Sequence, residues 1–205
     1  MQSAVRRHRC VLDGLARLRS TAAGRLRRVA VPALAALVAV ATVAATRSGV
    51  RIYTVESASM EPTLHCSGGP GCGRLRSDRV LVERLDLSLR PPRAGDVVVV
   101  RIEDSRIRCA GNGVVIKRIV AVGGQHVRAR NGSLYVDGRP RREPYVHPRA
   151  RAGIAFPSVR IPRGEVFLLG DNRSRSCDSR RFGPVPRSAI LGRVVFVLPS
   201  HLGVL

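Results

Sequence analysis

The hydrophobic pattern divides the chain into one long apolar segment near the N-terminus and a series of short apolar runs after it. Residues 29–46 are 18 consecutive residues without a charge, and most of them are Ala, Val or Leu. As a helix with a rise of 1.5 Å per residue, this segment would span about 27 Å, which is enough for the hydrocarbon core of a bilayer. The pattern therefore predicts a transmembrane helix over residues 29–46.

The charges on either side of this segment predict its orientation. Residues 1–28 carry eight Arg and a single acid, Asp13, whereas the next 20 residues after the segment carry only two Arg, Arg47 and Arg51, and no Lys. Because basic residues favour the cytoplasmic side, we expect a cytoplasmic tail over 1–28 and an extracytoplasmic domain over 47–205, in a single-pass protein of the plasma membrane. The alternative is a cleaved signal peptide, since Ala44 and Ala45 are small, although the apolar segment is long for one.

Beyond residue 47 the apolar residues fall in short runs rich in Val, separated by Gly, Pro, Asn and Asp. The predicted strands are residues 80–82, 97–102, 114–122, 133–136, 165–169 and 192–198. Runs of β-branched residues bounded by such turn residues are typical of strands, and no segment here has a long helical period. The domain is therefore predicted to be mainly β.

Composition adds a strong positive charge to this picture. The chain has 36 basic and 14 acidic residues, a net charge of +22, but only 3% aromatic residues and no Trp. Such a charge favours an anionic partner. A nucleic-acid platform would need aromatic side chains between the basic ones for base stacking, so we expect no nucleic-acid partner and favour an anionic lipid bilayer.

One basic residue differs from all the others. Of the 36 basic residues 35 are Arg, and the single Lys, Lys117, lies within the apolar run 114–122. A guanidinium stays protonated in a protein, whereas burial can lower the pKa of a lysine enough to free its amine. Lys117 is therefore the one basic residue besides His whose charge burial could remove.

The cysteines suggest disulfides in an oxidising compartment. Cys10 lies in the tail, and the other four, Cys66, Cys72, Cys109 and Cys177, follow the predicted membrane segment. Four cysteines allow three connectivities. Cys66 and Cys72 flank a Gly/Pro loop that can turn tightly, which leaves Cys109 with Cys177; four free thiols are the alternative. Without Cys-x-x-Cys or clustered His, we expect no metal and no cofactor.

Four segments, in this order behind an apolar anchor, resemble the signature segments of type I signal peptidases. They are residues 57–64 (SASMEPTL), 93–99 (RAGDVVV), 115–124 (VIKRIVAVGG) and 170–180 (GDNRSRSCDSR). The resemblance implies a signal-peptidase-like antiparallel β-sheet catalytic domain. The short stretch between the last two segments implies a small accessory β-region at about residues 125–164. One departure is Gln125 after Gly124, where the family commonly has Asp.

The resemblance also implies a catalytic dyad. Ser59 would be the nucleophile and Lys117 its general base, since a serine hydroxyl needs a base within hydrogen-bond reach. The hydroxyl of Ser57 and the backbone N–H of Ser59 would form the oxyanion hole, and Ser176 would orient the lysine amine. By the same resemblance, the supporting ion-pair cluster would consist of Arg118, Asp178 and Arg180.

The family's substrates are preproteins that carry signal peptides with a small-x-small cleavage site. The resemblance places the substrate strand between the segments of Ser57 and Lys117, beside shallow apolar pockets. The candidate pocket residues are Tyr53, Val55, Met60, Val115 and Ile116. For each of them, ordinary core packing is the alternative.

Two other functions are considered beside this one. A related Ser-Lys protease that cleaves itself, as stress repressors do, would act on cytoplasmic DNA, which the predicted anchor disfavours. A non-catalytic basic β-domain tethered at the membrane would bind anionic lipid or polymer without cutting a peptide bond.

Overall fold

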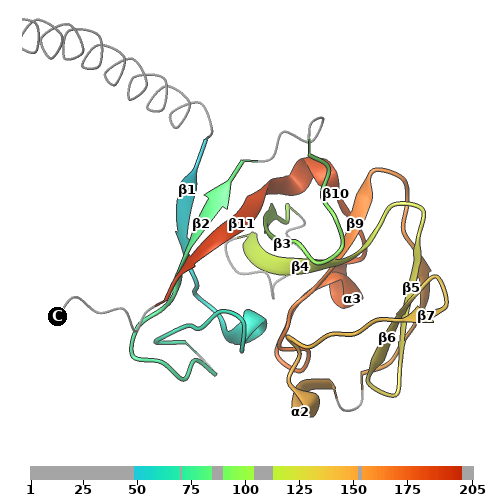
Figure 1. Ribbon diagram of the computed structural model, residues 1–205, viewed down its shortest axis with the longest axis horizontal. Coiled ribbons are helices and arrows are strands. Elements are labelled where there is room, and N and C mark those ends of the chain that lie inside the picture. The colour runs from blue at the N-terminus through green and yellow to red at the C-terminus, as the bar shows by residue number, and fades with distance from the viewer. Residues whose placement is uncertain (1–48, 70, 85–89, 104–112, 152–153, 200–205) are drawn as a thin grey trace, which may run out of the picture. The chain divides into compact units, whose positions relative to one another are not determined.

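The computed structural model of the chain describes residues 49–69, 71–84, 90–103, 113–151 and 154–199 (Figure 1). The Arg-rich tail and the transmembrane segment expected at residues 29–46 lie outside these ranges. In the part of the chain that the structure describes, no helix has both the length and the apolar character needed to cross a membrane.

Seven antiparallel strands form the larger sheet, in the order β1-β2-β11-β3-β4-β9-β10. They are β1 (Arg51–Thr54), β2 (Arg79–Glu83), β3 (Val97–Arg101), β4 (Val114–Val122), β9 (Glu165–Leu169), β10 (Val185–Pro186) and β11 (Ile190–Leu198). Most of these strands are runs of Val, Ile and Leu because the sheet is buried on both faces over much of its area. The strands expected from the apolar runs are all present, and the prediction of a mainly β domain is confirmed.

A smaller antiparallel sheet has four strands in the order β7-β6-β5-β8. These are β5 (His126–Arg130), β6 (Ser133–Val136), β7 (Arg139–Pro140) and β8 (Phe156–Arg160), and they lie within residues 125–164, where we expected an accessory β-region. Two-residue turns join β5 to β6 and β6 to β7. Both use a residue pair with positive φ, Asn131-Gly132 and Asp137-Gly138, as tight hairpins require.

The described helices are all short. They are η1 (Ala58–Met60), α2 (Pro148–Arg151), α3 (Ser179–Phe182) and η3 (Arg187–Ala189). Two of them overlap the segments singled out in the sequence. The turn η1 lies within residues 57–64, and α3 begins at the end of residues 170–180.

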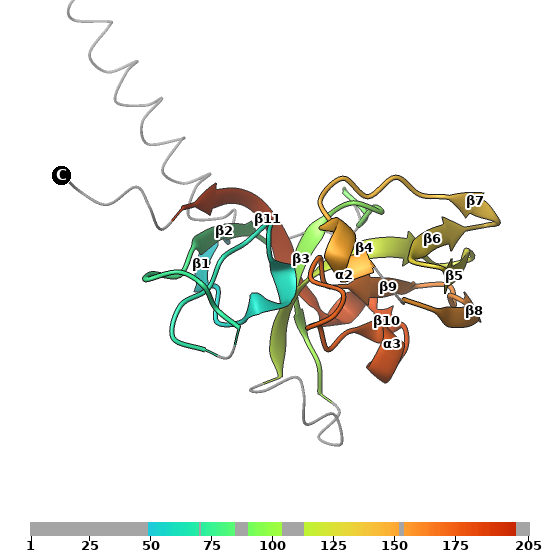
Figure 2. The same cartoon turned by 90° about the horizontal axis from the view of Figure 1, so that it is seen from below.

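Strand β4 connects the two sheets through the core. Its residues contribute to three buried clusters: Ile116 packs with residues of η1 and β2, Ile119 with residues of β3 and β9, and Ala121 with residues of the smaller sheet. Figure 2 shows β5–β8 at one end of β4 and β1–β2 at the other. The middle of β4, where Lys117 lies, is therefore held by packing from both ends.

Candidate active site

Ser59 and Lys117 meet although 58 residues separate them in the chain. Ser59 lies in the 3-10 turn η1, whose neighbours Ala58 and Met60 are buried in the core, and its own exposure is 7%. Lys117 projects from β4 and is 3% exposed. Its Nζ lies 2.8 Å from Ser59 Oγ and 3.0 Å from the carbonyl oxygen of Ile116. The nucleophile and base expected from the sequence are thus in direct hydrogen-bond contact.

Burial changes the protonation of this lysine. Desolvation lowers the pKa of Lys117 from its ordinary value of 10.5 to about 8, although the negative charges of Asp178 and Asp171 oppose the shift. An ammonium loses its water shell on burial, which disfavours the charged form. A substantial fraction of the amine is therefore neutral at mildly alkaline pH and able to accept the proton of Ser59.

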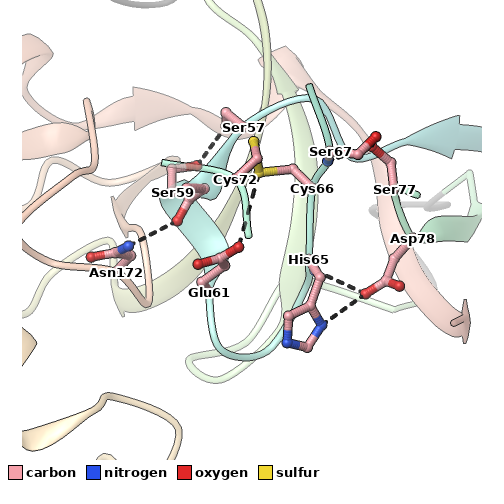
Figure 3. Close-up of a disulfide and its surroundings, with 11 residues drawn as sticks. Ser57, Ser59, Glu61, His65, Cys66, Ser67, Cys72, Ser77, Asp78 and Asn172 are labelled. Carbon is pink, nitrogen blue, oxygen red and sulfur yellow. Dashed lines mark hydrogen bonds and ion pairs between the residues drawn. A yellow bond between two sulfur atoms is a disulfide. The ribbon is translucent and has the colours of Figure 1, made fainter. Parts of the chain in front are cut away.

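Ser57 lies beside the nucleophile. Its hydroxyl oxygen is 3.1 Å from Ser59 Oγ, with one residue between them in the chain (Figure 3). The backbone of Ser57 is extended just before the turn of η1, which brings the two side chains together. The hydroxyl groups of Ser57 and Ser59 are therefore within hydrogen-bond distance of each other.

The loop at residues 170–172 supports the turn of Ser59 from the other side. The backbone N–H of Asn172 donates to the carbonyl oxygen of Ser59 at 3.1 Å, and Asn172 Nδ2 donates to that of Ala58 at 3.1 Å (Figure 3). A Cβ on Gly170 would lie 2.4 Å from the Ser59 carbonyl oxygen and 2.5 Å from Ser176 Cβ. Only glycine fits at residue 170 without moving the catalytic turn.

The residues expected in one cluster, Arg118, Asp178 and Arg180, take part in two ion pairs: Asp178 and Arg180 bind each other as expected, whereas Arg118 has another partner. Asp178 pairs with Arg180 at 2.7 Å and caps α3, whereas Arg118 pairs with Asp171 at 2.6 Å. The sheet register explains the difference: Arg118 lies opposite Leu169, the last residue of β9, and therefore beside the loop that follows it.

Asp171 is a residue of the site that sequence reasoning missed. Its carboxylate is completely buried, accepts two hydrogen bonds from Arg118 and accepts a third from Thr63 Oγ1 at 2.5 Å. It thereby joins β4 and the segment after Ser59 to the 170–172 loop. The signal was present, since Asp171 lies in the signature segment 170–180, but the ion pair across the sheet cannot be read from the chain.

Ser176 does not contact the amine that it was expected to orient. Its hydroxyl is buried, lies against Gly170 and has no hydrogen-bond partner among the residues that the structure describes. The carbonyl oxygen of Ser176 accepts from Arg180 Nη2 at 3.3 Å, so the Asp178–Arg180 pair holds its backbone. A buried hydroxyl without a partner is unusual in a folded protein and marks this position as part of a site.

A groove with a volume of about 800 Å³ leads to the dyad, and all five candidate pocket residues line it. Met60 and Val55 also belong to the core cluster under η1, and Tyr53 and Ile116 pack against the same cluster. Val115 packs against the opposite cluster of β3 and β9. Tyr53, Val55, Met60 and Ile116 thus both line the groove and pack in the core beneath it, so their contact with substrate stays a prediction. The packing of Val115 makes it the weakest candidate for such contact.

The loop after the nucleophile is closed by a disulfide between Cys66 and Cys72, with the Cα atoms 5.0 Å apart (Figure 3). Cys177 is disulfide-bonded as well. Its expected partner Cys109 lies outside the described residues, as does Cys10, so the Cys109–Cys177 pairing stays a prediction. Within the described ranges no group of three or more His, Cys, Asp or Glu side chains is placed to hold a metal ion.

Comparison with known proteins gives one consistent family. The family model described as "Signal peptidase, peptidase S26" matches residues 26–199. The signal peptidase I of Mycobacterium tuberculosis is 32% identical, over 75% of this chain and 67% of the relative. The probable signal peptidase I-1 of Synechocystis is 34% identical, over 69% of this chain and 67% of the relative. A crystal structure of a signal peptidase I from Enterococcus faecalis matches 52% of this chain and 98% of its own, at 28% identity and a TM-score of 0.43.

Proposed function

The chain belongs to the peptidase S26 family of signal peptidases and is a serine-type peptidase, and from this premise we propose that it removes signal peptides from exported preproteins with a Ser59–Lys117 dyad. The observation that carries the proposal is the 2.8 Å contact between Lys117 Nζ and Ser59 Oγ in a buried site. Membership of a peptidase family weighs against the alternative of a non-catalytic basic domain.

The geometry supports an acyl-transfer mechanism. Ser59 Oγ attacks the carbonyl carbon at the cleavage site while the neutral amine of Lys117 takes its proton. The oxyanion that forms accepts hydrogen bonds from the Ser57 hydroxyl and the Ser59 backbone N–H. Lys117 then gives its proton to the leaving amine of the mature protein. A water molecule, deprotonated by Lys117, releases the signal peptide from Ser59 and restores the free enzyme.

The surrounding residues keep this dyad in place. The Asp178–Arg180 pair holds the backbone of Ser176. We assign to the Ser176 hydroxyl, which has no other partner among the described residues, a hydrogen bond with the amine of Lys117 when substrate fills the groove. The second pair, Arg118–Asp171, fixes the strand residue that follows Lys117. The carboxylate of each pair is fully buried, so these pairs support the site more firmly than exposed ion pairs would.

The groove supports selection of small residues. A preprotein strand that lies between residues 53–57 and 114–117 would place its side chains against Met60 and Ile116. These bulky residues leave shallow apolar pockets, in which small side chains fit without displacing the core. We expect cutting after small-x-small sites for this reason.

The membrane anchor belongs to the same proposal. The family match begins at residue 26 and so includes the apolar segment 29–46, and the basic extracytoplasmic part suits an anionic bilayer surface. A signal-anchor would hold the groove close to the membrane, where signal peptides arrive during export.

Cleavage of a preprotein by the full chain in detergent tests the proposal. We expect wild type to cut once, after a small-x-small site, as read by N-terminal sequencing of the product. Ser59→Ala and Lys117→Arg should be inactive, because the first removes the nucleophile and the second replaces the base with a guanidinium that stays protonated. Ser158→Ala, in exposed β8, is the matched control and should cut normally.

Two results would overturn the proposal. Near-normal cleavage by Lys117→Arg would exclude a lysine base, and adhesion of the preprotein without any cleavage would favour a binding domain. A Ser59→Ala, Lys117→Ala double variant should be about as inactive as either single variant, because both residues act in one step. Additive losses would mean that they act in different steps.

A further inference from the structure

A buried ionic network lies next to the dyad and originates in the accessory region. Glu143, in the segment between β7 and α2, forms a two-point ion pair with Arg173, and each residue is only 3% exposed. Figure 1 shows this segment leaving the smaller sheet after β7 and running back to α2. A buried carboxylate and guanidinium in this geometry make strong, directional hydrogen bonds.

The first branch of the network reaches the nucleophile. Arg173 Nε donates to the carbonyl oxygen of Gly170 at 3.0 Å. Gly170 begins the loop that packs against the turn of Ser59, and Asn172 of the same loop donates to the carbonyl oxygen of Ser59. Glu143 is therefore linked to the turn of Ser59 through the side chain of Arg173 and the loop at residues 170–172.

The second branch reaches the base. The hydroxyl of Tyr145 donates to Glu143 Oε1 at 3.1 Å, and the ring of Tyr145 lies beneath the guanidinium of Arg118 at 3.9 Å. Arg118 directly follows Lys117 on β4. Burial and the nearby Glu143 raise the pKa of Tyr145 to about 12, so its hydroxyl stays a donor throughout the range in which the enzyme would work.

We propose that Glu143 and Tyr145 are positioning residues of the peptidase, which hold Arg173 and Arg118 and thereby set the geometry between Ser59 and Lys117. This proposal rests on the proposed function. It makes the accessory region part of the active site's support, since one carboxylate is tied to the loop of the nucleophile and to the strand of the base. Burial of a carboxylate is costly, and the hydrogen bonds from Arg173 and Tyr145 offset this cost, so a change at Glu143 should disturb both of these residues.

The first test compares kcat and KM for preprotein cleavage by the full chain, with active enzyme counted by titration of Ser59. Glu143→Gln keeps the shape but removes the charge, and we expect kcat to fall roughly 10- to 100-fold, with KM within about twofold of wild type. Tyr145→Phe loses one hydrogen bond and keeps the ring under Arg118, so its kcat should fall roughly fivefold.

A double variant separates positioning from simple loss of a residue. Arg173→Gln should lose activity as Glu143→Gln does, because each single change leaves one buried charge without its partner. The double variant Glu143→Gln, Arg173→Gln has no such charge and should lose less than the product of the two single losses. Leu134→Ala is the structural control: it opens a cavity in the accessory core, and its kcat per active molecule should match wild type.

The single lysine offers a test that does not depend on activity. Lysine labelled with ¹³C at the ε-carbon gives one signal, that of Lys117. In wild type we expect its titration midpoint at about 8. In Glu143→Gln the midpoint should move toward 10.5 as the site loosens and water reaches the amine, whereas Leu134→Ala should leave it in place.

The outcomes distinguish this inference from the proposed function. An inactive wild type would refute the proposed function, and the lysine signal would still decide the role of Glu143. An active wild type with unchanged kcat and an unchanged lysine midpoint in Glu143→Gln would overturn the positioning role alone. An equal loss of kcat in Leu134→Ala would also overturn it, because the effect would then come from general loosening of the fold.

Discussion

At the scale of single residues, the molecule depends on how Lys117 is buried. Apolar residues flank the Lys117–Arg118 pair on its strand, and desolvation outweighs the attraction of Asp171 and Asp178 for the ammonium. Arg at this position could pair with the same carboxylates but could not act as a base. The single Lys of the chain thus lies at the position where the proposed mechanism needs a cation that can lose its proton.

The pH dependence of cleavage follows from this pKa. We expect kcat/KM to rise with pH through a midpoint of about 8, because the amine must be neutral to accept the proton of Ser59. The midpoint should lie above that of a histidine base and below 10.5. Initial rates of preprotein cleavage between pH 6 and 10 check it. A flat profile over this range would contradict a lysine base.

The same burial makes Lys117 a cost to stability at neutral pH. Its pKa is lower in the fold than in the unfolded chain, so the folded state carries the full penalty below about pH 8, and the penalty fades as pH rises toward 10.5. Lys117→Met should raise the free energy of unfolding by up to about 3 kcal/mol at pH 7 and by little at pH 10.5. Denaturant titrations at both pH values measure this difference; equal gains at both would contradict it.

At the scale of elements, the site consists of one turn, one strand and one loop in close contact. The turn η1 supplies Ser59, β4 supplies Lys117, and the loop after β9 fills the space behind both. Gly170 sets how closely the loop can approach, since any side chain there would meet the backbone of Ser59. Close backbone contact keeps the nucleophile in one position while substrate binds beside it.

Gly170→Ala should therefore damage catalysis more than an ordinary loop substitution. We expect a fall in kcat of roughly 100-fold, because displacement of a nucleophile by about 1 Å is enough for such a loss. Preprotein cleavage by purified enzyme measures it. Gly73→Ala is the matched control, since a Cβ there meets no atom within 4 Å and the backbone is unstrained. Equal activity of the two variants would show that the loop can shift freely.

The strands that were missed in the sequence are those whose pattern is incomplete. β8 contains Pro157 and β1 is only four residues long; both lie at sheet edges, where an unpaired backbone tolerates Pro and a short length. β5 alternates Arg with two apolar residues, which is too few to distinguish a strand from a polar loop. β4 was predicted with its observed bounds, because its nine residues are mostly β-branched and contain no Gly, Pro, Asn or Asp to end the strand.

At the scale of the whole molecule, a basic peptidase domain follows an apolar segment and an Arg-rich tail. The charge of +22 is far larger than the site needs, and it is spread over most of the chain. We expect this charge to draw the chain toward an anionic surface, by an interaction that salt weakens.

Thiol labelling in intact cells tests the predicted topology. Cys10 should be protected from a membrane-impermeant maleimide and become reactive after permeabilisation, because the positive-inside rule places the tail in the cytoplasm. Ser158→Cys introduces an exposed thiol into β8 and should be labelled in intact cells, which serves as the control for access. Labelling of Cys10 in intact cells would show that the tail lies outside the cytoplasm and would contradict the predicted topology.

The sequence by itself predicted most of the larger sheet from short-range pattern, and the resemblance of four ordered segments indicated the family and the pairing of Ser59 with Lys117. It did not determine which charges pair. Arg118 binds Asp171 across 53 residues and Arg173 binds Glu143 across 30, and neither pairing leaves a local signal. Only the register of β4 against β9 and the return of the chain after β7 bring these groups together. Ion pairs depend on distance in space, which a folded sheet sets and a linear pattern does not.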